Sequence, residues 1–151
     1  MNIEQRLAAL GITLPRTPPP TANFVPTVQT GDLLFVSGHT SIWIEGSVQG
    51  KVGQDVSLEE AYTAARRVAV SLLGTVQDTL GDLNRVTRVV KLLGMVNSAP
   101  NFGEHGKVIN GASDLLVEIF GERGRHARSA VGMAQLPGSA AVEIEMILEV
   151  E

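Results

Sequence analysis

Arg128, Glu143 and Glu145 are the residues of this chain whose types and surroundings most strongly suggest chemistry. They lie in the C-terminal stretch 126–151, where two strand-like runs are joined at residues 136–139. Both glutamates sit inside the second run, where a buried sheet would ordinarily hold apolar residues. An arginine can hold a carboxylate through two parallel hydrogen bonds, and a glutamate can act as a general base. This stretch is therefore the candidate functional region.

The two runs predict an antiparallel hairpin if Leu136 pairs with Ala141. In that register Arg128 would lie opposite Glu149, and the alternation of strand side chains assigns each residue to one of two faces. Small residues let another sheet approach closely, and buried charges need partners. We therefore expect the mixed face to be a subunit interface and the apolar face to lie against helices. The mixed face would carry Arg128, Ala130, Gly132, Ala134, Glu143, Glu145 and Glu149, and the apolar face Val131, Met133, Ile144, Met146 and Leu148.

Distance along this hairpin would keep the two candidate residues apart within one chain. Arg128 and Glu143 would be about six rows apart, which is roughly 20 Å at about 3.3 Å per residue. If they cooperate, they must do so across subunits. The expectation depends on an even number of residues in the turn, because an odd number would swap the faces of one strand.

The rest of the chain predicts the elements that would hold this hairpin. Apolar residues at three- and four-residue spacing indicate helices, and β-branched or alternating runs indicate strands. Their order predicts an α+β fold with two helices packed on one face of a mixed sheet. The expected elements are a helix at 2–10 capped by Asn2, an extended proline-rich connector at 15–20, a hairpin of 23–29 with 33–37, a sheet extension at 42–44, a helix from its cap Ser57 to its stop Gly81, a central strand at 85–96, a helix at 106–120 and the terminal hairpin.

The size of the chain indicates a single domain. Its 151 residues suffice for one well-cored domain and are too few for two ordinary ones. We assign 1–22 to an N-terminal helix and connector, and 23–151 to the domain proper. Hydrophobic residues make up 44% and aromatic residues only 4%, so the core must be aliphatic, with apolar surface left for a partner subunit.

Composition disfavours several kinds of site. The chain has no cysteine, which excludes disulfides, thiolate metal sites and a cysteine nucleophile. Its net charge of -4 and the lack of a basic run disfavour nucleic-acid binding. His105 and His126 lack metal-ligand spacing with each other or with Glu104, so we predict no metal site. The N-terminus lacks the apolar stretch of a signal peptide or membrane span, so we expect no membrane partner and a cytoplasmic location.

Short motifs in the chain carry a family resemblance. The segments 127–129 (Ala-Arg-Ser), 136–137 (Leu-Pro) and 142–145 (Val-Glu-Ile-Glu) resemble the closing signature of the RidA/YjgF reactive-intermediate deaminase family, also labelled L-PSP endoribonuclease. Ser37-Gly38 after a strand and Asn110 in the second long helix fit the same pattern. The resemblance covers roughly residues 23 to 151.

The resemblance implies a fold, an assembly and a reaction. The fold would be chorismate-mutase-like, in a homotrimer whose sheets face inward and whose ligand clefts lie between subunits. The reaction would be hydrolysis of enamine or imine intermediates, such as 2-aminoacrylate, to 2-oxo acids and ammonia, without metal or organic cofactor. By similarity, Arg128 would hold the substrate carboxylate, and Glu143 of a neighbouring subunit would deprotonate the attacking water. The cleft would be lined by Ser37, Gly38, Ala130 and Asn110.

Two departures from the family pattern leave alternatives open. Phe24 stands where well-characterised deaminases carry a tyrosine, and His39 replaces the commoner glutamine; both would lie at the cleft. One alternative is a non-catalytic trimer that binds small carboxylates such as 2-oxo acids. Another is an endoribonuclease, which rests on the family's second label. Arg128 could also form a structural ion pair with Glu149, and His39 could be a hydrogen-bonded structural residue.

Overall fold

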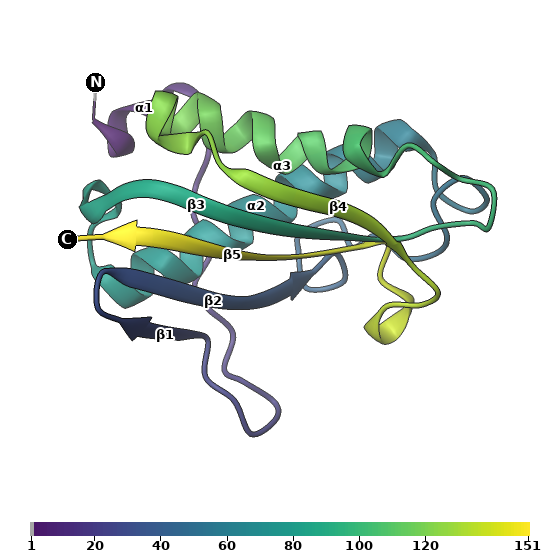
Figure 1. The fold of residues 1–151 in the computed structure, drawn as a ribbon, viewed down its shortest axis with the longest axis horizontal. Coiled ribbons are helices and arrows are strands. Elements are labelled where there is room, and N and C mark those ends of the chain that lie inside the picture. The colour runs from purple at the N-terminus through teal and green to yellow at the C-terminus, as the bar shows by residue number, and fades with distance from the viewer. Residues whose placement is uncertain (1) are drawn as a thin grey trace.

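The protein, described here over residues 2–151 of a computed structural model, has one five-stranded sheet with helices against it (Figure 1). The strand order is β1-β2-β5-β3-β4. Residues 2–151 form three α-helices and three short 3₁₀ turns. The strands are β1 (Thr27–Thr30), β2 (Leu33–Thr40), β3 (Val86–Asn97), β4 (Ala127–Met133) and β5 (Val142–Val150); the helices are α1 (Ile3–Ala9), α2 (Leu58–Leu80) and α3 (His105–Phe120); the turns are η1 (Leu83–Arg85), η2 (Gly121–Gly124) and η3 (Pro137–Ser139).

Capping signals mark the start of α1 and both ends of α2. The Asn2 side chain accepts a hydrogen bond from the Gln5 amide, and the Gln5 side chain accepts one from the Asn2 amide. The Ser57 hydroxyl accepts one from the Glu60 amide at the start of α2, and α2 ends at Gly81 with a φ of 80°. The expected helices at 2–10, 57–80 and 106–120 are therefore confirmed within a residue or two.

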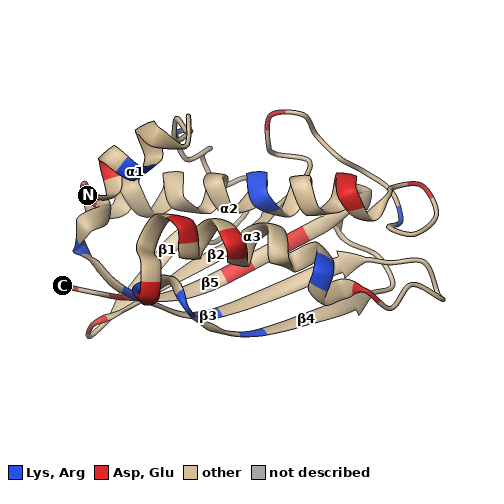
Figure 2. Ribbon diagram, turned by 90° about the horizontal axis from the view of Figure 1, so that it is seen from above, with Lys and Arg blue, Asp and Glu red and all other residues tan. Residues whose placement is uncertain are grey.

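An aliphatic core lies between the long helices and the sheet, as the composition predicts. Its members are almost all Leu, Val, Ile and Ala, with Phe120 as an aromatic member. In Figure 2 the helices lie on one side of the sheet and leave the other side open. The sequence predicts two helices on this face, and α2 and α3 take those places. The third helix, α1, packs against α3 and adds Ile3 and Leu7 to the core. The domain boundary expected at residue 22 stays a prediction.

The predicted terminal hairpin is wrong. β4 pairs with β3 in parallel, whereas β5 lies antiparallel between β2 and β3. The segment between them passes through η3 and crosses the end of β3 (Figure 1). The central position gives β5 hydrogen-bonding partners along both edges. A turn signal indicates only that the chain reverses, whereas the strand–helix–strand order of β3, α3 and β4 is typical of a parallel unit.

This topology keeps the predicted faces of β5 and swaps those of β4. Ile144, Met146 and Leu148 are buried toward the helices, as expected. On β4, however, it is Arg128 that points at α3, while Val131 is 38% exposed on the other side. The predicted pairing of Arg128 with Glu149 is also wrong, because Glu149 lies opposite Arg88 and accepts a hydrogen bond from Thr87.

The open face of the sheet mixes apolar and charged side chains in rows that run across the strands. Side chains directly opposite in register share a face, so the rows follow from the pairings. The sheet extension predicted at residues 42–44 is wrong, because these residues lie beyond the end of β2 and Trp43 is 66% exposed. The rows on the open face are Thr30, Leu33, Glu149 and Arg88; then Val28, Phe35, Ile147, Lys91 and Ala127; then Glu145, Leu93 and Ser129; then Thr40, Glu143, Met95 and Val131.

Candidate functional site

The first group of candidate residues gathers where β2 meets β5, and we call Phe24, Ser37, Gly38, His39 and Glu143 the base half. The register of β2 against β5 shifts between residues 36 and 39, so Ser37 and Gly38 form a bulge. A Cβ built on Gly38 would lie 2.6 Å from Oε2 of Glu143. Only glycine therefore lets the carboxylate lie against the backbone at this point.

The electrostatics of Glu143 suit a general base. The side chain is half-buried on the open face, one row from Glu145. Burial raises the pKa of the Glu143 carboxyl, and the negative charge of Glu145 raises it further. A carboxylate whose pKa is shifted toward neutral pH accepts a proton more readily than an ordinary one.

His39 is turned the other way, toward α2. Its Nδ1 lies 2.7 Å from the Ser71 hydroxyl, and its Nε2 lies 3.3 Å from the Thr75 hydroxyl. Burial lowers the pKa of His39, so the ring is neutral near pH 7. Both ring nitrogens already have partners, which matches the structural alternative considered from the sequence.

A pocket opens beside the base half. Its volume is about 130 Å³, and its lining joins four of the five expected residues to a stretch that we took to be a plain connector. Carbon surface from prolines and aromatic rings makes up most of the wall. The lining residues are Thr17, Pro18, Pro19, Pro20, Thr21, Phe24, Pro26, Ser37, Gly38, His39 and Trp43.

The remaining candidates form a second group between β4 and α3, and we call Asn110, Arg128 and Ala130 the arginine half. Nη1 of Arg128 donates to the Ser113 hydroxyl at 3.0 Å, and Nη2 donates to the Gly106 carbonyl at 3.2 Å. These two α3 residues flank Asn110 on one helix face, four residues before it and three after it. Ala130, two residues along β4, faces the same side as Arg128.

A short relay fixes the guanidinium. The Ser113 hydroxyl that accepts from Arg128 lies 2.9 Å from Nε2 of His126, and Nδ1 of His126 donates to the Gly124 carbonyl at 2.7 Å. Burial lowers the pKa of His126; the hydrogen bond to Gly124 opposes this shift, and the positive charge of Arg128 adds to it. A neutral His126 can therefore accept the Ser113 proton and leave the hydroxyl oxygen free to accept from Arg128.

The two halves do not meet within one chain. Arg128 is level with Leu92 and Met146, while Glu143 lies three residues along β5 from Met146. Two strand spacings and three rows separate the backbones of Arg128 and Glu143 by about 14 Å. Their side chains also point to opposite sides of the sheet. The distance between Arg128 and Glu143 is therefore shorter than a hairpin would give, but the two residues are still too far apart to act together within one chain.

Comparisons with known proteins place the chain in a family. Residues 4–149 match the family described as "YjgF/chorismate mutase-like, putative endoribonuclease". Protein TCP17 of Trypanosoma cruzi is 45% identical over 98% of this chain and 94% of its own length. The chain belongs to the YjgF/chorismate mutase-like family.

Two further relatives of this family member extend the comparison. The crystal structure of protein Atu1372 from Agrobacterium tumefaciens is 48% identical, with a TM-score of 0.89 over 99% of this chain and 94% of that one. A 2-iminobutanoate/2-iminopropanoate deaminase from Dermatophagoides farinae is 27% identical over 93% of this chain and 95% of its own length. The RidA/YjgF resemblance read from the motifs is confirmed.

Several residues of this YjgF-family site escaped sequence reasoning. Ser71 and Thr75 hold His39, Ser113 holds Arg128, and Trp43 lines the pocket. Ser71, Thr75 and Ser113 are polar interruptions of otherwise apolar helix faces, which was the available signal. In the range 2–151, no cluster of three or more His, Asp or Glu side chains is placed to hold a metal ion. None of the helices formed by the described residues has the length and apolar character needed to cross a bilayer.

Proposed function

We propose that this chain forms a homotrimer that hydrolyses reactive enamine or imine intermediates, such as 2-aminoacrylate, to 2-oxo acids and ammonia at clefts between subunits. The observation that carries the proposal is the Glu143 carboxylate, held against Gly38 with a raised pKa beside a pocket of about 130 Å³. The relative named 2-iminobutanoate/2-iminopropanoate deaminase supports the class of reaction.

The open face of the sheet supports assembly into a trimer. Val28, Phe35 and Val131 are 54%, 41% and 38% exposed on this side, alongside the half-buried Glu143. Several large apolar side chains exposed on one face of a sheet favour an interaction surface. Packing of three such sheets around an axis would cover them, and it would bring the base half of one subunit toward the arginine half of the next.

The chemistry asks for orientation and one base. Arg128, already oriented by Ser113 and Gly106, would bind the substrate carboxylate with its remaining N–H groups. Glu143 would remove a proton from a water molecule as that water adds to the imine carbon. In the resulting carbinolamine, the amine would take up the proton held by Glu143 while the hydroxyl loses its own proton, so that the C–N bond breaks, ammonia leaves and the 2-oxo acid remains. An iminium carbon is already electrophilic, so positioning provides much of the acceleration.

The direct test is turnover of 2-aminoacrylate generated enzymatically in the assay. We expect the protein to accelerate loss of the imine over buffer, and Arg128→Ala to abolish most of that acceleration. A parent protein no faster than buffer, with Arg128→Ala indistinguishable from it, would sink the proposal.

The between-subunit arrangement has its own test. We expect Glu143→Gln and Arg128→Ala proteins, each inactive alone, to recover activity when they are unfolded and refolded together. Recovery would approach about a quarter of the parental activity, the share of clefts in a random mixture that joins an intact Arg128 to an intact Glu143. Sedimentation would check that the species are trimers. A mixture no more active than its parts would mean that one chain supplies both groups.

A second candidate function is a non-catalytic trimer that binds small carboxylates such as 2-oxo acids. Phe24 favours it, because a phenyl ring at the pocket supplies no hydroxyl to orient a water molecule. Calorimetry with pyruvate separates the two candidates. Binding that survives Glu143→Gln, without imine turnover by either protein, would favour the binding function.

A third candidate, endoribonuclease, is named in the description of the family. The net charge of -4 disfavours a path for a phosphate backbone. Incubation with single-stranded RNA over a range of salt concentrations tests it, and we expect no cleavage at any of them.

A further inference from the structure

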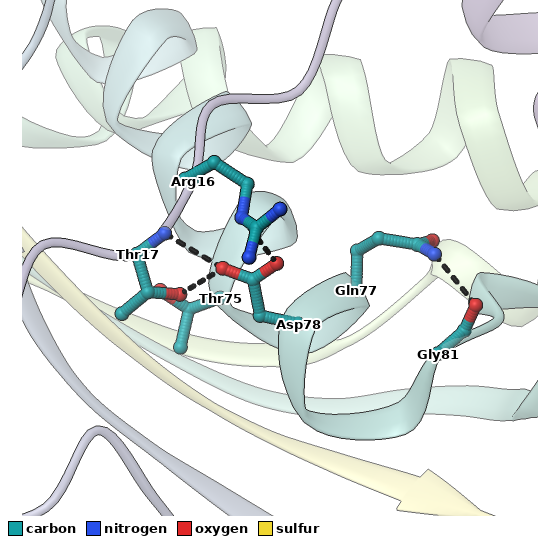
Figure 3. Close-up of polar contacts among 6 residues, drawn as sticks. All are labelled: Arg16, Thr17, Thr75, Gln77, Asp78 and Gly81. Carbon is teal, nitrogen blue, oxygen red and sulfur yellow. Dashed lines mark hydrogen bonds and ion pairs between the residues drawn. The ribbon is translucent and has the colours of Figure 1, made fainter.

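Residues 15–21, which we call the proline strap, cross α2 on their way from α1 to β1 (Figure 1). Thr17 fastens the strap to the helix through Asp78. The Thr17 amide and hydroxyl donate to Oδ2 of Asp78 at 2.7 and 2.8 Å, and Nε of Arg16 lies 3.3 Å from Oδ1 (Figure 3). The Thr17 hydroxyl also lies 3.1 Å from that of Thr75. The strap is thus held at a defined place on α2.

Two residues of α2 are unfavourable in a helix, and their contacts with the strap explain why they are there. Asp78 lies in the last turn, where the helix dipole disfavours a carboxylate, yet the two Thr17 hydrogen bonds and Arg16 lower the pKa of this carboxyl. Gly74 lies in the helix interior, where glycine is unfavourable. A Cβ at Gly74 would overlap the Pro15 carbonyl oxygen. Both positions therefore serve the strap and not the helix.

The fixed strap forms one wall of the pocket beside the base half. Pro18, Pro19 and Pro20 line it together with Phe24 and Trp43. Three polar side chains of the lining already have hydrogen-bonding partners: the Thr17 hydroxyl donates to Asp78, the Ser37 hydroxyl donates to the Val25 carbonyl at 2.7 Å, and both nitrogens of His39 contact α2 hydroxyls. An occupant therefore meets carbon surface, and a charged group would be desolvated there without a partner.

The volume indicates the size of that occupant. About 130 Å³ is close to the roughly 150 Å³ of an engineered apolar cavity that holds benzene. A phenyl or branched alkyl group fits this space, whereas the methylene of 2-aminoacrylate would leave most of it unfilled. Because Ser37 and Gly38 belong both to the pocket and to the bulge beside Glu143, the group would extend from the reacting carbon.

We propose that the proline strap is a specificity-determining wall, and that the pocket it closes receives a phenyl-sized or branched apolar side chain of the substrate. The preferred substrates are then imino acids that carry bulky apolar side chains. The substrate class rests on the proposed function, whereas the selection of a bulky apolar group can be tested without turnover.

The binding test uses the 2-oxo acids 4-methyl-2-oxopentanoate and pyruvate. Trp43, the only tryptophan of the chain, lines the pocket and reports occupancy by its fluorescence. We expect the branched acid to bind at least about tenfold more tightly, because three more carbons leave water. Asp78→Ala, which releases Thr17, should reduce this preference to about twofold or less, and Gly74→Ala should act in the same direction by displacing Pro15.

Gln77→Ala is the matched control. Gln77 lies one residue from Asp78 on α2, and its side chain donates to the Gly81 carbonyl (Figure 3). We expect this variant to keep the parental preference. Equal binding of the two acids by the parent, or a preference unchanged in both Asp78→Ala and Gly74→Ala, would overturn the role of the strap.

Turnover of the corresponding imines, made in the assay from leucine or supplied as 2-aminoacrylate, separates this inference from the proposed reaction. We expect kcat/KM of the parent to favour the leucine-derived imine by about tenfold or more. Hydrolysis of both imines at equal efficiency would overturn the selection and leave the reaction standing. Selective binding of the branched acid without hydrolysis of either imine would uphold the strap and overturn the reaction.

Discussion

The base half and the arginine half hold their charged groups in different ways. Two hydrogen bonds, to Ser113 and Gly106, orient Arg128, and the Ser113–His126 relay supports the first of them. Glu143 instead lies against the backbone of a bulge, where burial and Glu145 raise its pKa. A cation held in a fixed direction suits recognition of a carboxylate, and a carboxylate destabilised in its charged form suits proton transfer. This difference supports the proposed roles, in which the arginine half binds the substrate and the base half reacts with it.

The largest effect should come from the reacting half. Glu143→Gln keeps the shape of the side chain and removes the base, so we expect kcat for 2-aminoacrylate to fall by about 10²- to 10⁴-fold. KM should change little, because in the proposed mechanism Arg128 binds the substrate carboxylate. Glu149→Gln, a matched change on the same strand and face, should retain most of the activity. A KM effect that outweighed the kcat effect would break the division between the halves.

Arg128→Lys should give the next largest effect, and it should change KM instead of kcat. Lysine keeps the positive charge and loses the planar pair of donors, so we expect KM to rise by about 10- to 100-fold. Initial rates over a range of imine concentrations measure it. Arg125→Lys, three residues away and paired with the exposed Glu122, is the control and should match the parent. An unchanged KM in Arg128→Lys would remove the arginine half from substrate binding.

Two glycine substitutions test the same difference between the halves, and their effects on kcat and KM should be smaller. A Cβ at Gly38 would lie 2.6 Å from Oε2 of Glu143, and one at Gly106 would lie 3.2 Å from Nη2 of Arg128. We expect Gly38→Ala to lower kcat by about tenfold, one factor of ten being about 1.4 kcal/mol of barrier, and Gly106→Ala to raise KM by only a few-fold. Gly103→Ala has open space around it and should behave as the parent. Identical kinetic signatures from Gly38→Ala and Gly106→Ala would contradict the separate roles.

The helices and most of the sheet could be predicted from the sequence because their signals are local. Asn2, Ser57 and Gly81 mark helix ends, and a Gly-Asp turn marks the hairpin of β1 and β2. The pairing of β4 could not be predicted from its turn, because a turn indicates a reversal without indicating which strand lies alongside. The order β3, α3, β4 held the better signal, since a helix between two strands is typical of parallel neighbours.

The sequence indicates candidate site residues, but it does not indicate how the fold arranges them. Arg128 was expected on the open face and lies against α3, because one wrong pairing swaps a whole strand. The hydroxyls of Ser71, Thr75 and Ser113 come from helices, and their role depends on a tertiary contact that no local pattern records. The proline strap was interpreted as a connector for the same reason. Its contact with Asp78 spans 61 residues of sequence.

The pH dependence of activity should report the environment of Glu143. Because the pKa of this carboxyl is raised, kcat should fall with decreasing pH at a value above the ordinary glutamate range of about 4.3. Glu145→Gln removes one cause of the shift and should move this acid limb to lower pH by less than about one unit. Profiles of kcat against pH for the parent and Glu145→Gln test this. A limb that moved to higher pH in the variant would contradict the repulsion between the two carboxylates.

The smallest expected effect concerns stability and again belongs to the base half. A carboxyl whose pKa is raised on folding contributes stability that is fully present below its unfolded pKa and is lost as pH rises through the folded pKa. Glu143→Gln cannot ionise and so avoids this loss of stability. The variant should therefore have a higher free energy of unfolding than the parent at pH 7, and the difference should disappear near pH 4. The gain should stay below about 1 kcal/mol, because solvent screens a half-exposed group. Urea unfolding at both pH values and one protein concentration measures it, with Glu149→Gln for comparison. A larger advantage at pH 4 than at pH 7 would mean that the carboxylate is stabilised by folding, and Glu143 would then be a structural residue like the relay beside Arg128.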